Sequence, residues 1–323
     1  MLHFSIVIPT YNGADFVEQA LLSALSQTRT ADEIIVSDDN STDETIAICQ
    51  KYADKIKIYT NPQGPSGFVN GWNNAISKAT GDFISILHQD DIIKPDFLAE
   101  IEKAIQIYPN VKHLFVPCNY IDEKGKSLQE PDYCTGEIKK YCGREYVRAY
   151  QTVGHPHIHR CPGVVTHRDI FKICTYREEA GHIADDDFFY RVGQYTDIVG
   201  ILKSLASYRL HQKSETGHLS NNILIQRLAN DYIYQLNQFS NNSVFDKFAL
   251  EYFKKKAIHF SFNEFFMGLK YQNSPLKIKG KKDLSILEKD FNLILPLKMR
   301  LFVETEKIIG NSVMSQICKH LKF

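Results

Sequence analysis

The alternation of short β-branched runs with helix-patterned segments over residues 4–108 constrains the fold more than any other feature of this chain. Strand-like apolar runs occur in FSIVIP, EIIVSDD, IKIYT and DFISIL. Helical spacing of apolar residues separates them in DFVEQALLSALSQ, FVNGWNNAISKA and PDFLAEIEKAIQIY. Strands and helices in such an order build a parallel, doubly wound sheet covered by helices. We therefore predict an α/β fold with a mainly parallel central sheet.

The second half of the chain has a different pattern. After Val116 we expect mixed strands and loops, with a helix in DDDFFYRVGQY and a strand in LASYRLH. Beyond about His218 the sequence is helical, and we predict PLKIKGKKDL as an exposed basic loop. We place a domain boundary between an α/β domain of residues 1–215 and a helical region of residues 216–323. The residues that we expect on one face of the first helix of that region are Ile225, Leu228, Tyr232, Leu236 and Phe239.

One local prediction concerns the segment STDET. Ser41 and Glu44 have the spacing of a capping box, in which each side chain binds a free N–H group of the first helical turn. We therefore expect these two residues to start the helix that follows EIIVSDD.

Composition and cysteine content indicate a soluble globular protein of the cytoplasm. The 323 residues are 43% hydrophobic and 24% charged, which is an ordinary globular balance. The apolar stretch near the start is too short for a signal peptide or a membrane span, and no later run approaches 18 apolar residues. The seven cysteines are scattered and contain no Cys-x-x-Cys pair, which suits a reducing compartment.

The net charge of zero hides an asymmetry. Residues 216–323 carry 16 Lys and Arg against 9 Asp and Glu, a balance of +7, so residues 1–215 carry −7. The acidic part should attract cations and the basic part an anionic partner. Apolar residues lie between basic ones in FNLILPLKMRLF, which suggests peripheral contact with an anionic membrane. The alternatives are packing on the first domain or on a second copy in a homo-oligomer; no nucleic-acid partner is expected.

Polar residues follow three of the predicted strands. They occur in PTYN after the first strand, in Asp38 and Asp39 after the second, and in QDD after the fourth. In open α/β sheets, ligands bind outside the carboxyl ends of the strands. Neither a G-x-G-x-x-G pattern nor a P-loop is present to hold phosphate. Because Asp90 and Asp91 would repel each other, we expect Mg²⁺ or Mn²⁺ beside them, where the cation could bridge to a phosphate.

Five segments in order are similar to family 2 glycosyltransferases of the GT-A fold. The similarity covers roughly residues 3–216 and rests on SIVIPTYNGADFVEQALLSALSQT, EIIVSDDNSTDET, ATGDFISILHQDDIIKPDFL, ADDDFFYR and SYRLHQKSET. It implies a metal-dependent, inverting enzyme that moves a sugar from a nucleotide diphosphate, most simply a UDP-sugar. The implied acceptor is a hydroxyl of a glycan or of a lipid-linked saccharide.

The resemblance also assigns roles to individual residues. Asp39 would accept a hydrogen bond from the imide N–H of the base, and Asp90 would lie near the ribose. Asp91 would ligate the metal at the surface of the crevice, and His211 would approach the metal or the diphosphate from the far side. Asp185 would be the general base. The remaining donor-binding residues would be Pro9, Thr10, Tyr11 and Asn73.

Structural alternatives exist for these assignments. Asp38 and Asp39 could belong only to the turn before the next helix, and Tyr11 could serve packing. Asp185 could be one acid of a helix start favoured by the helix dipole, a purpose that its two following aspartates would serve equally. His211 is a single histidine at a strand end.

Three positions depart from the usual family pattern. His88 and Ala184 stand where acids are common, and Trp72 stands where many members have an arginine before Asn73. Because Trp72 replaces that arginine, the resemblance does not define which residues contact the diphosphate and the base of the donor. Two other functions stay open as well: a non-catalytic protein that binds sugar nucleotides or glycans, and a sugar-phosphate nucleotidyltransferase. The latter should show a glycine-rich loop with an arginine where this chain has TYNGAD.

The segment GHPHIHRC places His155, His157 and His159 two residues apart. On an extended strand the three imidazoles would share one face, and Cys161 lies nearby, which would suit zinc. The alternative is an acceptor-side loop that uses histidines for hydrogen bonds, and Pro156 disfavours a regular strand.

Overall fold

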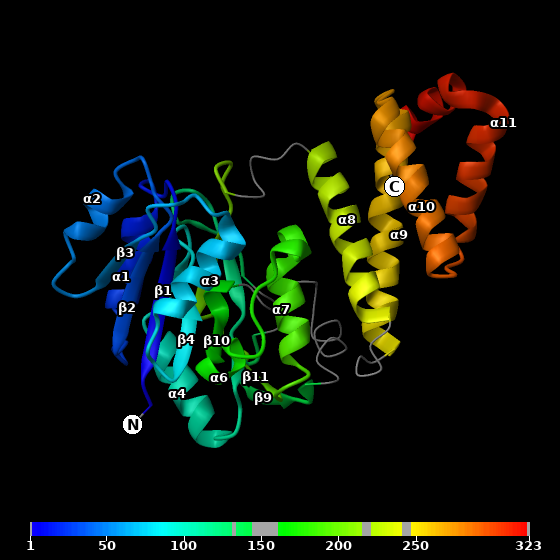
Figure 1. The fold of residues 1–323 in the computed structure, drawn as a ribbon. Helices are drawn as coiled ribbons and strands as arrows, with labels where there is room; N and C mark the ends of the chain where they lie inside the picture. The colour runs from blue at the N-terminus through cyan, green and yellow to red at the C-terminus, as the bar shows by residue number, and fades with distance from the viewer. Residues whose placement is uncertain (1, 131–133, 144–160, 215–220, 241–246, 322–323) are drawn as a thin grey trace. The chain divides into compact units, whose positions relative to one another are not determined.

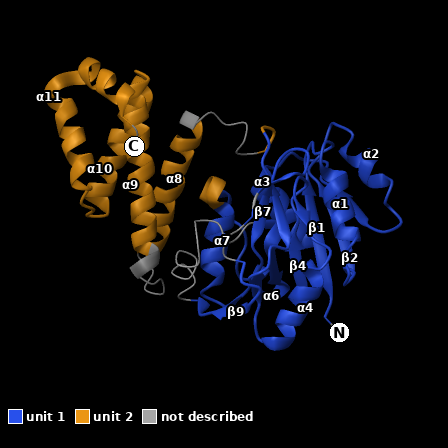
Figure 2. Ribbon diagram, turned by 180° about the vertical axis from the view of Figure 1, so that it is seen from behind, with its two compact units in different colours: residues 1–178, 184–211 blue, residues 179–183, 212–323 orange. Residues whose placement is uncertain are grey.

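The computed structural model describes residues 2–130, 134–143, 161–214, 221–240 and 247–321. The chain divides into two compact units (Figure 2). The first comprises Met1–Glu178 and Ala184–His211, and the second comprises Glu179–Ile183 and Gln212–Phe323.

An eight-stranded sheet, counted over the described residues, forms the centre of the first unit (Figure 1). Its strands are β1 (Phe4–Thr10), β2 (Glu33–Asp38), β3 (Lys57–Thr60), β4 (Phe83–Ile86), β6 (His113–Phe115), β9 (Ile138–Tyr141), β10 (Val164–His167) and β11 (Ile198–Ile201). Their order is β3-β2-β1-β4-β10-β6-β11-β9. The first four strands run parallel, β10 is antiparallel to both of its neighbours, and β9 is antiparallel to β11. The predicted parallel sheet is confirmed, including its mixed second half.

Helices cover both faces of this sheet. They are α1 (Val17–Leu25), α2 (Thr45–Gln50), α3 (Phe68–Lys78), α4 (Phe97–Ile107), α6 (Arg168–Phe171) and α7 (Ala184–Val192), with short 3₁₀ segments at Cys161–Gly163 and Glu178–Ile183. Side chains alternate along a strand, and Phe4, Ile6 and Ile8 of β1 share one apolar core with α1, α2 and α4. Helix α3 packs against β1 and β2 and contributes no residue to that core, which places it on the opposite face.

A smaller sheet lies beyond β4 along the chain. Its strands are β5 (Ile92–Ile93), β7 (Cys118–Ile121), β8 (Ser127–Gln129) and β12 (Ala206–Arg209), in the order β5-β12-β7-β8. Strand β5 follows Asp91 directly and pairs antiparallel with β12. The pairing therefore fixes the Asp90-Asp91 turn against the strand that leads to His211.

The second unit is helical, as the sequence predicts. It contains α8 (Asn221–Ser240), α9 (Lys247–Lys270), α10 (Ser274–Asp290) and α11 (Leu297–His320), the last interrupted by non-helical backbone at Gly310. On α8 the predicted apolar face is buried at Tyr232, Leu236 and Phe239 and half-buried at Ile225 and Leu228. Tyr232 stacks on Phe260, and Phe239 stacks on Phe253. Over the described residues, no helix combines the length and the hydropathy that crossing a bilayer requires.

The prediction of a basic loop in PLKIKGKKDL is wrong, because the segment lies in α10. The side chain of Asn273 caps this helix by accepting from the N–H of Leu276, and Pro275 occupies its first turn. A Cβ atom at Gly280 would lie 2.3 Å from the backbone nitrogen of Phe265. The glycine of this segment permits close approach of α10 to α9.

The predicted capping box is also wrong. The Ser41 hydroxyl donates to the Asp38 carboxylate at 2.5 Å, and the backbone N–H of Ser41 donates to the same carboxylate at 2.9 Å. Helix α2 begins only at Thr45, whose N–H donates to Asp43. Asp38 therefore organises this turn instead of the Ser41-Glu44 pair.

Candidate active site

The side chain of Gln89 holds the backbone that follows the carboxyl end of β1. The Gln89 side-chain amide accepts from the Tyr11 N–H at 2.9 Å and donates to the Tyr11 carbonyl at 3.0 Å. A Cβ at Gly13 would lie 2.2 Å from the Gln89 side-chain oxygen, so a larger residue there would displace the Gln89 amide. These contacts fix the backbone of Tyr11 and leave the residue 44% exposed, with its ring available to a ligand.

The two acids at the end of β2 have different surroundings. Both are buried, and Asp38, the last residue of β2, accepts from the Thr10 hydroxyl at 2.9 Å. Asp39 accepts from the Asn61 side-chain amide at 2.8 Å and from the Ser66 N–H at 2.6 Å. Asp38 thus supports the turn, whereas Asp39 ties the loop of residues 61–66 to the strand end.

The adjacent acids after β4 also differ in their environment. Asp91 is only 1% exposed, and its Oδ1 accepts from the backbone N–H of Arg209 at 2.8 Å. The side chain of Asp90 is 19% exposed, and its Oδ2 lies 2.8 Å from Nε2 of His211. The expectation that Asp91 lies at the surface of the crevice is wrong, because Asp90 is the more accessible acid.

Arg209 organises the turn that carries both acids. Its guanidinium donates to the carbonyl of Asp90 at 2.7 Å, to Gln19 at 2.9 Å and to the carbonyls of Asp122 and Glu123 at 3.0 Å each. Burial lowers the pKa of Arg209 while the nearby aspartates raise it, and a guanidinium stays charged in proteins. Arg209 is not among the site residues predicted from the sequence, although an arginine inside the strand-like run LASYRLH indicates a buried charge with partners.

The structure adds His88 to the acid pair. One ligand atom from each of His88, Asp90 and Asp91 lies within 4.8 Å of the others. Burial lowers the pKa of His88 despite the opposing charges of Asp90 and Asp185, which favours the neutral imidazole that binds metals. Burial would raise the pKa of Asp90, but the hydrogen bond of His211 and the charges of both histidines outweigh it, and the pKa is lowered.

This donor set fits a divalent cation. Two carboxylates and one neutral imidazole are ligands for Mn²⁺, and the oxygens also suit Mg²⁺. The sequence analysis proposed Asp91 and His211 as ligands. The structure places His211 against Asp90 and brings His88, which the sequence analysis noted only as a departure, into the group instead.

Aromatic side chains line the site next to His88. The Trp72 ring stacks on His88 with 4.8 Å between ring centroids, and the ring of Tyr176 meets Trp72 edge to face at 5.3 Å. The Asn73 side-chain amide donates to the Tyr176 carbonyl at 2.9 Å and accepts from the Tyr176 N–H at 3.2 Å. Trp72 therefore presents an aromatic surface where family members often have a charge, and Asn73 holds Tyr176 in place.

The three acids at the start of α7 separate into two kinds. Asp187 is fully buried and pairs with Arg191 at 2.7 Å to Nε and 2.6 Å to Nη2. Asp185 and Asp186 are partly exposed, and the Asp186 N–H donates to the Asp185 carboxylate at 2.9 Å. The charge of Asp185 acts to raise the pKa of His88, so the two side chains are near each other.

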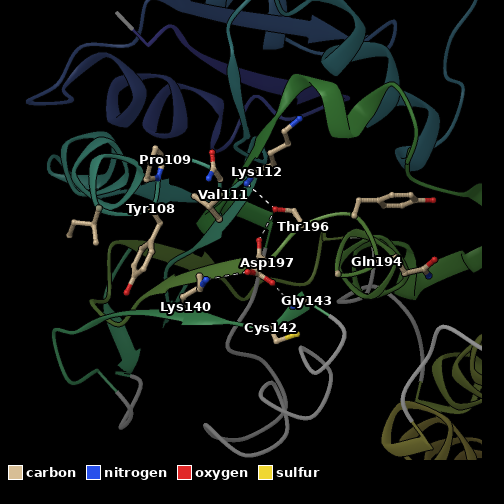
Figure 3. A pocket seen from close by; sticks show the side chains of 14 residues that line it. Tyr108, Pro109, Val111, Lys112, Lys140, Cys142, Gly143, Gln194, Thr196 and Asp197 are labelled. Atoms are coloured by element: carbon tan, nitrogen blue, oxygen red, sulfur yellow. Dashed lines mark hydrogen bonds and ion pairs between the residues drawn. The ribbon is translucent and has the colours of Figure 1, made fainter.

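A separate hollow of about 540 Å³ lies at the other end of the strands, where β6 and β11 begin (Figure 3). Its lining residues precede β6 and β11 or follow β9, so it opens where parallel strands begin. Lys112 pairs with Asp169, and Lys140 pairs with Asp197. The position and the neutralised charges distinguish this hollow from the candidate active site.

The proposed zinc ligands His155, His157 and His159 lie outside the described residues.

Comparison with known sequences identifies the family. Residues 5–171 match the family model described as Glycosyl transferase family 2, and the chain belongs to that family. An uncharacterized glycosyltransferase of Rickettsia prowazekii is 31% identical over 223 residues, which span 68% of this chain and 67% of that protein. The GalNAc(5)-diNAcBac-PP-undecaprenol beta-1,3-glucosyltransferase of Campylobacter jejuni is 35% identical over 137 residues, 40% of this chain and 42% of that protein.

Solved structures share the fold. TarS 1-349 of Staphylococcus aureus, in complex with UDP-GlcNAc, has a TM-score of 0.66 at 17% identity. The superposition covers 98% of this chain and 91% of the TarS chain. The mannosyltransferase PcManGT of Pyrobaculum calidifontis, in complex with GDP-Man and Mn²⁺, has a TM-score of 0.57 at 14% identity, covering 98% of this chain and 84% of that chain. The expected GT-A fold is confirmed, and the protein is a family 2 glycosyltransferase.

We predict that Arg209→Lys destabilises the first unit. One ammonium group cannot reach four separate acceptors, and buried acceptors left without a donor cost about 1–3 kcal/mol. The free energy of unfolding, measured by urea titration, should fall by that amount. Lys203→Gln, which removes a partly exposed cation paired with Glu100, is the control and should change it by less than about 1 kcal/mol. Equal stability of Arg209→Lys and the native protein would contradict this role.

Proposed function

We propose that this protein is an inverting glycosyltransferase that moves a sugar from a UDP-sugar to a hydroxyl of a glycan or of a lipid-linked saccharide. The observation that carries the proposal is the group of His88, Asp90 and Asp91 after β4, with the carboxylate of Asp185 near His88. The name of the Campylobacter relative describes a polyprenol-linked acceptor, and TarS was solved with UDP-GlcNAc. Both support the donor and acceptor classes.

In this proposal a divalent cation, Mn²⁺ or Mg²⁺, is held by Asp90, Asp91 and His88, with His211 orienting Asp90. Bound there, the cation supplies charge stabilisation for the diphosphate leaving group. Asp90 is the principal ligand because it is the more accessible acid, and Asp91 anchors the turn through the Arg209 N–H. Mn²⁺ in the PcManGT complex supports metal use in this fold.

Donor binding is proposed at the carboxyl ends of β1 and β2. The exposed ring of Tyr11 stacks on the base, while Pro9 and Thr10 shape the strand end beneath it. Asp39 accepts from the imide N–H. Asn73 acts indirectly, because both polar atoms of its amide already hold the backbone of Tyr176.

The proton step is assigned to Asp185. Its carboxylate accepts the proton of the acceptor hydroxyl while that oxygen attacks the anomeric carbon. The bond from the anomeric carbon to the diphosphate oxygen breaks in the same displacement, and UDP leaves with the electron pair. Because attack and departure occur on opposite faces, the anomeric configuration inverts and no covalent enzyme intermediate forms.

The metal assignment predicts loss of activity in chelator. UDP release from a panel of UDP-sugars with a saccharide acceptor should stop in excess EDTA and return with Mn²⁺ or Mg²⁺. Asp90→Asn should weaken Mn²⁺ binding in the presence of UDP, measured by calorimetry, by more than the about 10–100-fold typical of outer-shell changes. Asp54→Asn, at an exposed position, is the matched control. Full activity of the native protein in chelator would refute the metal assignment.

Base recognition by Asp39 predicts a preference for UDP over CDP, because cytosine lacks the imide proton. A hydrogen bond to a charged group contributes about 1.5–3 kcal/mol, so the native protein should bind UDP roughly 10–100-fold more tightly than CDP. Asp39→Asn should lower this ratio, because the amide oxygen accepts the same hydrogen bond without a charge. If the variant weakens UDP and CDP equally and keeps their ratio, Asp39 only anchors the loop of residues 61–66.

The base assignment predicts that Asp185→Asn lowers the transfer rate by about 10²–10⁴-fold, since asparagine keeps the shape but cannot accept the proton. Affinity for UDP, measured by calorimetry, should stay within a few fold of the native value. Asp186→Asn, the neighbouring acid of similar exposure, is the control and should lose far less activity. Greater sensitivity at Asp186 than at Asp185 would move the acceptor site to a different register of α7.

A further inference from the structure

Helix α11 carries apolar side chains on two opposite faces before its interruption at Gly310. The inner face packs into the core of the second unit through Met299, Phe302 and Val303. The outer stripe consists of Leu297, Leu301 and Ile308. A helix that only needs to pack against its own domain requires one apolar face, so the second one calls for another partner.

The outer stripe is compact and exposed. At 100° per residue, its three side chains fall within roughly 40° around the helix axis, opposite the packed face. Leu297 is 60% exposed, Leu301 56% and Ile308 82%. Further exposed aliphatic residues adjoin it in sequence, namely Ile294 before the helix and Ile309, Val313 and Ile317 at four-residue spacing.

Basic side chains flank the outer stripe. Lys298 lies on one side of it by helical position, and Arg300 and Lys307 lie on the other, all three exposed. Two exposed acids lie near Lys307: Glu304, which pairs with it at 2.7 Å, and Glu288 of α10, whose charge also raises the pKa of Lys307. The second acid of this part of the helix, Glu306, is buried and pairs with Lys277 and Lys281 of α10. The surface around the stripe is therefore cationic.

Charge favours an anionic bilayer over an identical face of a second copy. Residues 216–323 carry +7, so pressing this face against an identical face would bring like charges together. An anionic bilayer instead complements the lysines and arginine while its acyl chains accept the aliphatic side chains. Amphipathic helices with basic flanks bind membranes in this way, lying in the plane of the interface.

We propose that the outer stripe of α11 with its basic flanks docks the protein on the surface of an anionic phospholipid bilayer. Leu297, Leu301 and Ile308 enter the boundary between headgroups and acyl chains, while Lys298, Arg300 and Lys307 contact the lipid phosphates. This surface lies outside the residues assigned to transfer. The inference goes beyond the proposed reaction and does not rest on it, because vesicle binding is measured without donor or acceptor.

The test is co-sedimentation of the full chain with vesicles of phosphatidylcholine alone or with about one third phosphatidylglycerol. We expect binding to the anionic vesicles at low salt and a steep decline with added salt, because basic residues near the surface are screened. Leu297→Ser/Leu301→Ser/Ile308→Ser should lower the partition coefficient by roughly one to two orders of magnitude through lost aliphatic burial. The exposure of these residues in the native protein argues against unfolding of the variant, which circular dichroism checks.

Two control variants test whether binding depends on this face and on its charge. Leu128→Ser/Ile173→Ser removes aliphatic residues of similar exposure from the first unit and should leave vesicle binding unchanged. Lys298→Gln/Arg300→Gln/Lys307→Gln should remove the preference for anionic vesicles. Absence of binding at low salt, or equal binding by the stripe variant, would overturn the proposal. So would a native oligomer, detected by analytical ultracentrifugation, that the stripe variant converts to monomer, because the stripe would then be an interface between copies.

Discussion

The contact between Arg209 and the Asp90-Asp91 turn is the interaction on which the rest of the site depends. Two adjacent carboxylates at a strand end repel each other, and burial of Asp91 makes that repulsion more costly. Arg209 offsets it in two ways: its backbone N–H binds the Asp91 carboxylate, and its guanidinium binds the Asp90 carbonyl and lies over the ring of Phe16. The acid pair is thereby stabilised by the protein itself, before any cation binds.

The same contact explains how distant parts of the chain assemble one site. Arg209 ends β12, and that strand pairs with β5 immediately after Asp91. His211 follows two residues later and reaches Asp90, while its ring lies 4.5 Å from that of Phe16. A displacement of β12 would therefore disturb the arginine, the histidine and both acids together.

The sequence predicts the fold well because local periodicity and global topology agree. The four parallel strands and the helices between them follow from alternating patterns that no long-range information is needed to detect. The errors occur where one residue type has two uses. Gly280 lies in a segment predicted as a loop but permits contact between helices, and Ser41 was predicted to cap a helix but binds the Asp38 carboxylate. The partner of Gly280 lies on another helix, whereas that of Ser41 lies three residues before it, on the opposite side from the predicted Glu44.

The sequence predicts that the site lies at the strand ends, but it does not show which of the acids there are buried and which are accessible. Asp90 and Asp91 are identical side chains one residue apart, and only the position of β12 decides which of them is buried. The acids of α7 show the same limit, because the partner that removes Asp187 from solvent, Arg191, lies one turn further along the helix. His88 is only a departure from the family pattern in the sequence, and its distance to the two acids is what places it with them.

Gln89 has a consequence for the shape of the crevice. Strands β1 and β4 pair through their backbones as far as Val7 and Ile86, and the Leu87 N–H still reaches the Val7 carbonyl. At Tyr11 the strands are joined instead by an amide at the end of a side chain. The two strands can therefore separate by the length of the Gln89 side chain while hydrogen bonds still connect them. Beyond Val7 and Ile86, the separation of the two strands is therefore bridged by the side chain of Gln89, and the length of that side chain limits how far they can separate.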